Sequence, residues 1–96
     1  FGEDAYLTSQ FGVSFVKGLQ GTDLKNNAHV ISTLKAVAGH ASPESGHNAG
    51  AAHLGERELH EFLLPPFKEA VKAGALSVMS SYNEIDGVPS TGNHYL

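Results

Sequence analysis

Apolar residues recur at helical spacing in the first part of the chain. Residues 4–20 repeat a large apolar side chain every four positions, which is the pattern of one helix face. The residues of that face are Leu7, Phe11, Phe15 and Leu19, with Val16 beside them. Asp4 is a suitable N-cap, and Gly18 or Gly21 is a suitable end. The pattern therefore predicts a helix over residues 4–20.

A second helix is predicted from about Glu56 to Gly74. Its proposed apolar face consists of Leu59, Phe62, Leu63, Phe67 and Val71. Pro65 and Pro66 interrupt this pattern, and because proline lacks a backbone N–H, we expect the helix to kink or restart there. Gly74 supplies a stop signal.

Two stretches are apolar and β-branched without helical length. Residues 29–39 read HVISTLKAVAG and residues 75–82 read ALSVMSSY, and we interpret both as strands buried on both faces. Each is followed by a loop rich in glycine and polar residues, 39–50 and 83–93, the second containing an Asp-Gly turn signal. Residues 94–96 are expected to begin a third helix.

The predicted order is helix, strand, helix, strand, which is typical of an α/β fold with a parallel sheet and right-handed crossovers. Two strand–helix units cannot close a sheet by themselves, so we expect further strands outside the chain. A partial (β/α)8 TIM-like barrel is the first choice, and a doubly wound sheet is the second. The chain of 96 residues starts at Phe1 without an initiator methionine or a signal peptide. We interpret residues 1–96 as an internal segment of a longer protein.

Charge and cysteine content narrow the function classes. The formal net charge is −4 and no basic run occurs, which disfavours nucleic acid and membrane surfaces as partners. The chain has no cysteine, so disulfides and thiolate metal sites are excluded. His40, His47 and His53 do not follow a known metal-ligand spacing, and we expect no metal. The remaining histidines and the glutamates of the second helix are expected on the surface.

Candidate chemistry lies where polar residues follow the two strands. In parallel α/β folds, ligands bind at the carboxyl ends of the strands. This rule selects residues 35–40 and 79–83. Lys35 either meets a polar substrate or carboxylate, or forms a structural salt bridge inside a barrel. Tyr82 either stacks on a sugar or packs under a loop, and Met79 fits a core position as well as a site.

Longer stretches of the chain resemble a known family. They are FGEDAYLTSQFGVSFVKGLQG, HLGERELHEFLLPPFKEAVKAGALSVMSSYNEIDGVPS and GNHYL. Together they resemble the N-terminal catalytic barrel of glycoside hydrolase family 3, the β-glucosidase and β-xylosidase group. The resemblance implies that residues 1–96 are a fragment of a first domain with the (β/α)8 fold. It also implies retaining hydrolysis of β-linked sugars at non-reducing ends, without a metal or organic cofactor.

The resemblance assigns sugar-binding roles to four residues. The family motif K-H-F-x-G-H places its lysine at Lys35 and its second histidine at His40. Met79 and Tyr82 match the methionine and tyrosine that line the same −1 subsite. The first histidine of the motif is Ala36 here. One sugar contact is therefore missing, which costs roughly 0.5–1.5 kcal/mol for a neutral hydrogen bond.

The resemblance places both catalytic carboxylates outside this chain. Its nucleophile is an aspartate shortly beyond Leu96, and its acid/base is a glutamate in a second domain. The expected partners are thus a small-molecule or oligosaccharide β-glycoside and the rest of the same protein, namely its other barrel strands and second domain. Two alternatives are a sugar-binding pseudoenzyme that has lost turnover, suggested by Ala36, and a zinc-binding module using the loop histidines. The absence of cysteine fits a cytoplasmic, a periplasmic and a secreted protein equally.

Overall fold

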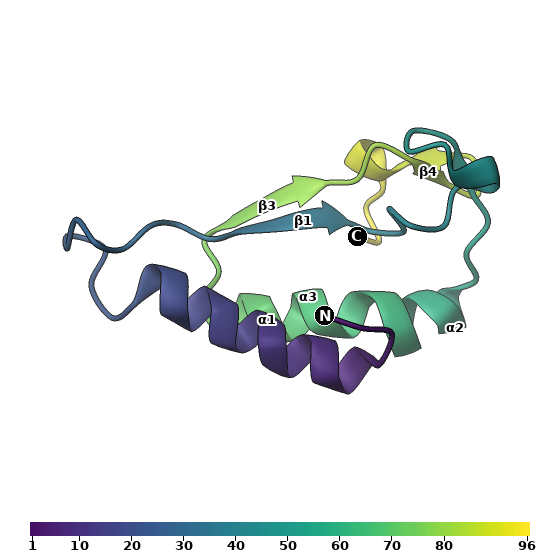
Figure 1. The fold of residues 1–96 in the computed structure, drawn as a ribbon. Coiled ribbons are helices and arrows are strands. Elements are labelled where there is room, and N and C mark those ends of the chain that lie inside the picture. The colour runs from purple at the N-terminus through teal and green to yellow at the C-terminus, as the bar shows by residue number, and fades with distance from the viewer.

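A computed structural model describes residues 1–96, and it shows a helix layer on one side of a short parallel sheet, with a second small sheet beyond the strand ends (Figure 1). The helical elements are α1 Ala5–Gln20, η1 Glu44–Gly46, α2 Glu56–Glu58, η2 Leu59–Leu63, α3 Leu64–Lys72 and η3 Ser90–Gly92. The strands are β1 Thr33–Val37, β2 Ala51–Ala52, β3 Ser77–Ser80, β4 Glu84–Ile85 and β5 Val88–Pro89. The predicted order of helices and main strands is confirmed. No helix is both long enough and apolar enough to cross a membrane.

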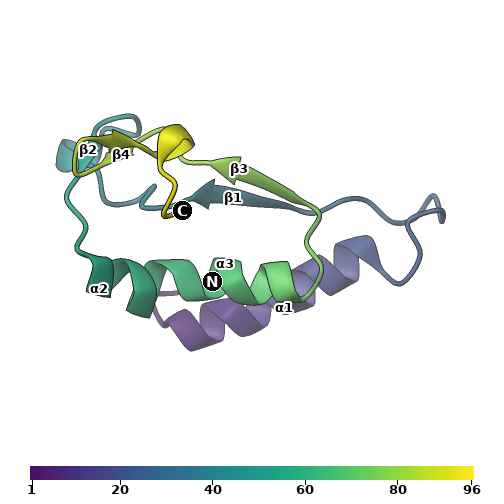
Figure 2. The same ribbon diagram turned by 180° about the vertical axis from the view of Figure 1, so that it is seen from behind.

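Helix α1 has the predicted bounds but a different buried face. Asp4 caps its start by accepting a 2.6 Å hydrogen bond from the Leu7 amide, and Gly21 ends it. Helix α1 packs on α3 (Figures 1 and 2) and buries Ser9, Val16 and Gln20. The predicted apolar face is largely uncovered: its exposed members are Leu7, Phe11, Phe15 and Leu19. The physical reason is that one neighbouring helix covers only one side of α1.

The second helix restarts at the prolines, as predicted. Helix α2 continues through the π-helical turn η2 into α3, whose first turn holds Pro65 and Pro66. The wider turn accommodates prolines, which have no amide to donate to the preceding carbonyls. Gly74 follows the helix with a φ of 98°, in the region that favours glycine.

Strands β1 and β3 pair in parallel, which confirms the predicted sheet. Ser32, directly before β1, bonds to Gln20 of α1, so the side of the strand shared by Ser32 and Leu34 faces the helices. Thr33 and Lys35 therefore look away from the helices, and both are exposed. Residues 1–96 by themselves thus leave the outward face of these strands uncovered, and the predicted burial on both faces depends on the further strands expected outside the chain. Val78 is also 54% exposed on the helix side, because two helices cover only part of the sheet.

The second sheet has the order β2-β4-β5 and lies beyond the carboxyl ends of β1 and β3 (Figure 1). A two-residue turn joins β4 to β5, with φ values of 47° at Asp86 and 87° at Gly87, which fits the predicted Asp-Gly signal. The core beneath this sheet consists of Ala52, Leu54 and Ile85, with Leu59, Leu63 and Leu96 packed against it.

Residues 94–96 do not begin a helix, contrary to the prediction. They follow η3 as a turn, and the Leu96 amide bonds back to the Asn93 carbonyl at 3.2 Å. Leu96 packs instead against the small core of the second sheet.

One buried side chain ties α1 to both main strands. The Gln20 amide nitrogen donates to the Gly74 carbonyl at 2.8 Å. Its oxygen accepts from the Ser32 hydroxyl at 2.8 Å and from the Ser32 and Leu76 amides, each at 3.2 Å. Gln20 therefore fixes the points at which β1 and β3 begin relative to the helix layer.

Candidate functional site

Lys35 and Met79 lie side by side in the parallel pair. They are Cα partners in the register of β1 and β3, so both side chains share the face that looks away from the helices. Lys35 is exposed and Met79 is partly buried. Lys35 takes part in none of the ion pairs of the structure, which are His53 with Glu44 and Asp86, Arg57 with Glu61, and Lys72 with Glu69. Within this chain, the ammonium of Lys35 is thus free to meet a ligand.

His40 and Tyr82 follow the carboxyl ends of the same two strands. His40 comes just after β1, next to Gly39, and its side chain is exposed. Tyr82 comes just after β3 and is 63% exposed. The structure therefore brings the four predicted residues to one end of one sheet, with Lys35 and Met79 in direct register. It shows no hydrogen bond among their side chains.

Ala36, which replaces a histidine of the motif, is covered. It is 6% exposed and lies between the exposed Lys35 and the partly buried Val37. The structure therefore offers no side-chain donor at this position to a ligand above Lys35 and Met79.

Asn83, which ends the candidate segment 79–83 and begins the predicted loop, is buried at the junction of the strand ends. It is 1% exposed, and its amide nitrogen donates to the Ala38 and Glu84 carbonyls at 3.3 and 3.1 Å. Its amide oxygen accepts a hydrogen bond from the Ser81 hydroxyl. The Ser90 hydroxyl donates to the main-chain carbonyl of Asn83 at 2.7 Å. Sequence periodicity gave no sign of this role, because a polar residue after a strand is normally solvent-exposed.

His53 joins the two loops that follow the strands. Its Nδ1 lies 3.4 Å from an Asp86 oxygen, and its Nε2 lies 3.0 Å from a Glu44 oxygen. Hydrogen bonding to Asp86, then to Glu44, together with the charge of Glu44, raises the pKa of His53 above 6.5. The sequence gave no sign of this arrangement, because Asp86 is distant in the chain. No group of three or more His, Asp or Glu side chains is arranged to hold a metal ion.

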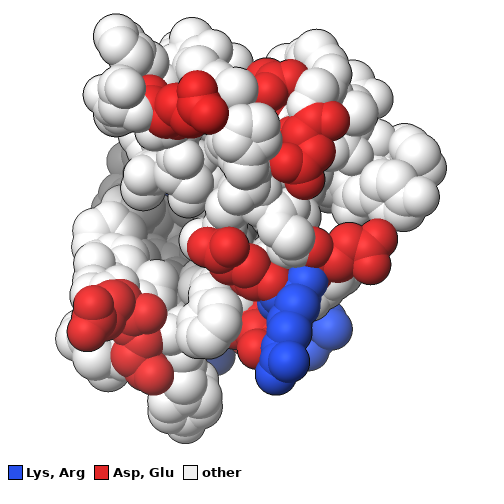
Figure 3. Space-filling model, turned by 90° about the vertical axis from the view of Figure 1, so that its right-hand side faces the viewer, with Lys and Arg blue, Asp and Glu red and all other residues white.

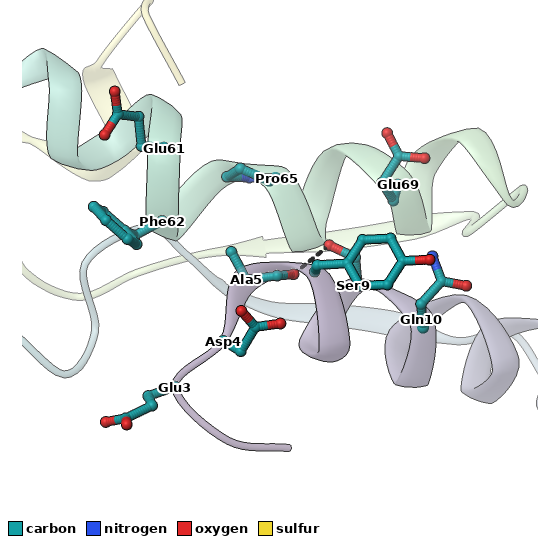
Figure 4. A pocket seen from close by; sticks show the side chains of 10 residues that line it. Glu3, Asp4, Ala5, Ser9, Gln10, Glu61, Phe62, Pro65 and Glu69 are labelled. Carbon is teal, nitrogen blue, oxygen red and sulfur yellow. Dashed lines mark hydrogen bonds between the residues drawn. The ribbon is translucent and has the colours of Figure 1, made fainter.

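A groove lies elsewhere, between the start of α1 and the second helix (Figure 4). It has a volume of about 550 Å³ and contains none of the four predicted site residues. Tyr6 and Phe62 supply aromatic surface, while Glu3, Asp4, Glu61 and Glu69 make its lining acidic. Glu61 and Glu69 are already paired with Arg57 and Lys72. This groove is therefore separate from the surface that carries Lys35 and Met79.

The end of the molecule that carries the strand ends is mainly acidic. Figure 3 shows Asp and Glu side chains spread over this face and basic side chains gathered at one place on it. Such a surface repels polyanions, whereas it does not exclude an uncharged ligand such as a sugar.

Comparison with protein families identifies the chain. The family described as "Glycosyl hydrolase family 3 N terminal domain" matches residues 1–96. The chain belongs to this family. The parallel pair β1 and β3 with its helices is accordingly part of a TIM-like barrel, as the sequence predicted.

Relatives of this glycosyl hydrolase family 3 chain are named as enzymes that act on β-linked sugars. A "Beta-xylosidase" of Formosa agariphila is 44% identical over 100% of this chain and 14% of its own length. The "Periplasmic beta-glucosidase" of Salmonella typhimurium is 32% identical over 100% of this chain and 12% of its own length. The chain thus spans at most 14% of the length of these two curated relatives.

Solved structures agree with this family relationship. The β-glucosidase from Listeria innocua in complex with isofagomine matches 99% of this chain and 14% of its own chain, with a TM-score of 0.91 and 35% identity. The same enzyme has also been solved in complex with glucose, with a TM-score of 0.90 and 34% identity over 98% of this chain and 14% of that one. A fold this close supports matching the family motif to positions of this chain.

Proposed function

We propose that residues 1–96 form part of the N-terminal (β/α)8 catalytic barrel of a longer β-glycosidase. The whole protein hydrolyses terminal, non-reducing β-D-glycosidic bonds with retention of configuration. Lys35, His40, Met79 and Tyr82 line the subsite for the terminal sugar. The observation that carries this proposal is the register of Lys35 with Met79, at the strand ends of a chain whose relatives are named as β-xylosidases and β-glucosidases.

Each proposed residue suits the recognition of a pyranose. Lys35 offers up to three N–H donors to sugar hydroxyls, and no carboxylate of this chain competes for them. Tyr82 presents an exposed aromatic ring to the apolar face of a sugar, and Met79 beside Lys35 supplies adaptable apolar contact. His40 adds a ring nitrogen that donates or accepts a hydrogen bond.

The bond-breaking groups come from other parts of the protein in this proposal. Retaining glycosidases use two carboxyl groups about 5–5.5 Å apart, one as nucleophile and one as acid/base. Neither Lys35 nor its neighbours on β1 and β3 is a carboxylate. The segment binds and orients the sugar, and we expect it to be inactive alone. The hydrolase names of the relatives give no support to a sugar-binding protein without turnover.

Kinetics on the full-length protein test this proposal. Wild-type protein is assayed with aryl β-glucoside and aryl β-xyloside, and NMR identifies the anomer released first. We expect hydrolysis of at least one substrate, with the β-anomer appearing first. Lys35→Ala should lower kcat/KM by about 10- to 100-fold, because a hydrogen bond from a charged donor is lost. Lys25→Ala, at an exposed loop lysine, is the matched control and should leave kcat/KM unchanged. Inactivity on both substrates, initial release of the α-anomer, or equal effects of the two substitutions would contradict the proposal.

A further inference from the structure

Tyr82 has an exposed side chain between two fully buried neighbours. Tyr82 is 63% exposed, whereas Ser81 and Asn83 are each 1% exposed. Ser81 donates its amide to the Val37 carbonyl at 2.7 Å, which ties it to the end of β1. The backbone of Tyr82 is therefore fixed on both sides, although its ring is free to meet a ligand.

The Asn83 side chain connects the ends of the two main strands. Its amide nitrogen donates to the carbonyl of Ala38, which directly follows β1 and is 0% exposed. Its second donor reaches the Glu84 carbonyl, and its oxygen accepts from the Ser81 hydroxyl. No buried side-chain nitrogen or oxygen in the structure is left without a partner. The hydrogen-bonding capacity of Asn83 is thus matched to its surroundings.

The same contact reaches the other side of the proposed sugar site. Gly39 separates Ala38 from His40, and a Cβ at Gly39 would lie 3.3 Å from the Asn83 amide nitrogen. Gly39 also has a φ of +80°, so the chain turns sharply against Asn83 just before His40. Asn83 thereby contacts the backbone on which His40 is placed and the backbone on which Tyr82 is placed.

We propose that Asn83 is a positioning residue for the sugar subsite: its buried amide locks the ends of β1 and β3 together and so sets His40 relative to Tyr82. This inference rests on the proposed function, because it assigns Asn83 to the placement of the residues that bind the sugar. An amide is required at this position. It supplies two donors to carbonyl oxygens and one acceptor to a hydroxyl, and a carboxylate of the same shape supplies no donor.

Asn83→Asp in the full-length protein tests the role of the amide. The change keeps the size of the side chain but places a carboxylate oxygen against the Ala38 and Glu84 carbonyls. We expect KM for the better aryl glycoside to rise about tenfold, with a smaller change in kcat, because misplaced binding groups weaken sugar binding. The inhibition constant of the free sugar should rise by the same factor. Hydrogen–deuterium exchange should increase in residues 37–41 and 81–84.

Ser90→Ala is the matched control. It removes a buried hydrogen bond to the main-chain carbonyl of the same Asn83 but leaves the amide contacts in place. We expect it to lower thermal stability while changing KM less than about twofold, because the amide contacts of Asn83 to both strand ends remain in place.

The outcomes separate the two proposals. If wild-type protein hydrolyses neither glycoside, the proposed function fails and this inference fails with it. If wild-type protein is active but Asn83→Asp leaves KM and the sugar inhibition constant unchanged, the positioning role alone is overturned. Equal KM changes in Asn83→Asp and Ser90→Ala would reduce Asn83 to a general stabilising residue. If Asn83→Asp does not fold, Ser81→Ala removes the hydroxyl that orients the amide, and an unchanged KM in that variant overturns the role.

Discussion

Replacing Gln20 by alanine tests how the helix layer sets the start of both main strands. Gln20 is 8% exposed and makes four side-chain hydrogen bonds, three of them accepted by its oxygen. Two of those three come from Ser32, which is 5% exposed and precedes β1 directly. The other partners are Gly74 and Leu76, on the connection between α3 and β3.

The cost of Gln20→Ala follows from which partners water can reach. Gly74 is exposed and Leu76 is 60% exposed, so water replaces the contacts to both. The hydroxyl and the amide of Ser32 are buried and lose their acceptor. A buried polar group left without a partner costs about 1–3 kcal/mol, which gives about 2–4 kcal/mol for the two after partial rearrangement of the hydroxyl. In a domain of 150–250 residues, this corresponds to a fall in melting temperature of about 4–16 °C.

Thermal denaturation of the full-length protein measures this effect. Gln10→Ala is the control, because Gln10 lies on the same helix, is exposed and makes no side-chain hydrogen bond. Alanine has the higher helix propensity, so this control should not lower the melting temperature. If the melting temperatures of the two variants agree within experimental error, then Gln20 does not hold the strands and the energetic reasoning is wrong.

Two further predictions concern the loops at the strand ends. The hydrogen bonds of His53 to Asp86 and Glu44 favour the protonated ring, which raises its pKa. These bonds therefore stabilise the folded protein below pH 6.5, and this stabilisation is lost as the pH rises through the raised pKa. Wild type should therefore melt at a higher temperature than His53→Gln below pH 6.5, and this difference should shrink at higher pH. A difference in melting temperature that does not vary with pH would contradict this. Gly39→Ala should destabilise the fold more than Gly46→Ala. Both glycines have a positive φ, but a Cβ at Gly39 would lie 2.6 Å from the Leu54 side chain, whereas a Cβ at Gly46 would meet no atom within 4 Å. Beyond the strain of about 1–2 kcal/mol common to both, the clash should lower the Gly39→Ala melting temperature further, and equal melting temperatures would refute it.

Local signals along the chain predicted the elements well. The Asp4 cap, the prolines of the second helix and the Asp-Gly turn each act through their own backbone, so their effects can be read from a few neighbouring residues. The strand segments were also found, although β1 and β3 are shorter than the apolar runs that predicted them. These are short-range effects, and the parallel pairing then follows from the alternation of strands and helices.

Burial was predicted less well, because it depends on what lies across the fold. The spacing of Phe11 and Phe15 indicates an apolar helix face correctly, yet the side of α1 that packs on α3 carries Ser9 and Gln20 instead. Phe11 is covered in part by Phe1, with ring centroids 5.6 Å apart. Periodicity identifies a face but does not identify its neighbour.

The residues of the candidate site divide in the same way. Lys35 and Met79 follow from the rule that parallel strands present their carboxyl ends at one edge, and the register pairs them. The contacts of Asn83 and His53 were not predicted, because each acts through partners in other segments: Asn83 through Ala38, and His53 through Asp86. A single sequence carries no marker for contacts of this kind.

The anchoring of β1 at both ends has a consequence for how related chains change in length. Upstream, Ser32 is held by Gln20, and downstream, the Val37 carbonyl is held by the Ser81 amide. One residue inserted between Ser32 and Lys35 would turn Lys35 from the outward face to the helix side, since strand side chains alternate. The connection at 21–28 is exposed throughout and bears no such constraint. The connection at 21–28 should therefore tolerate changes in length, whereas the number of residues from Ser32 to Lys35 decides which face of the sheet carries the amine.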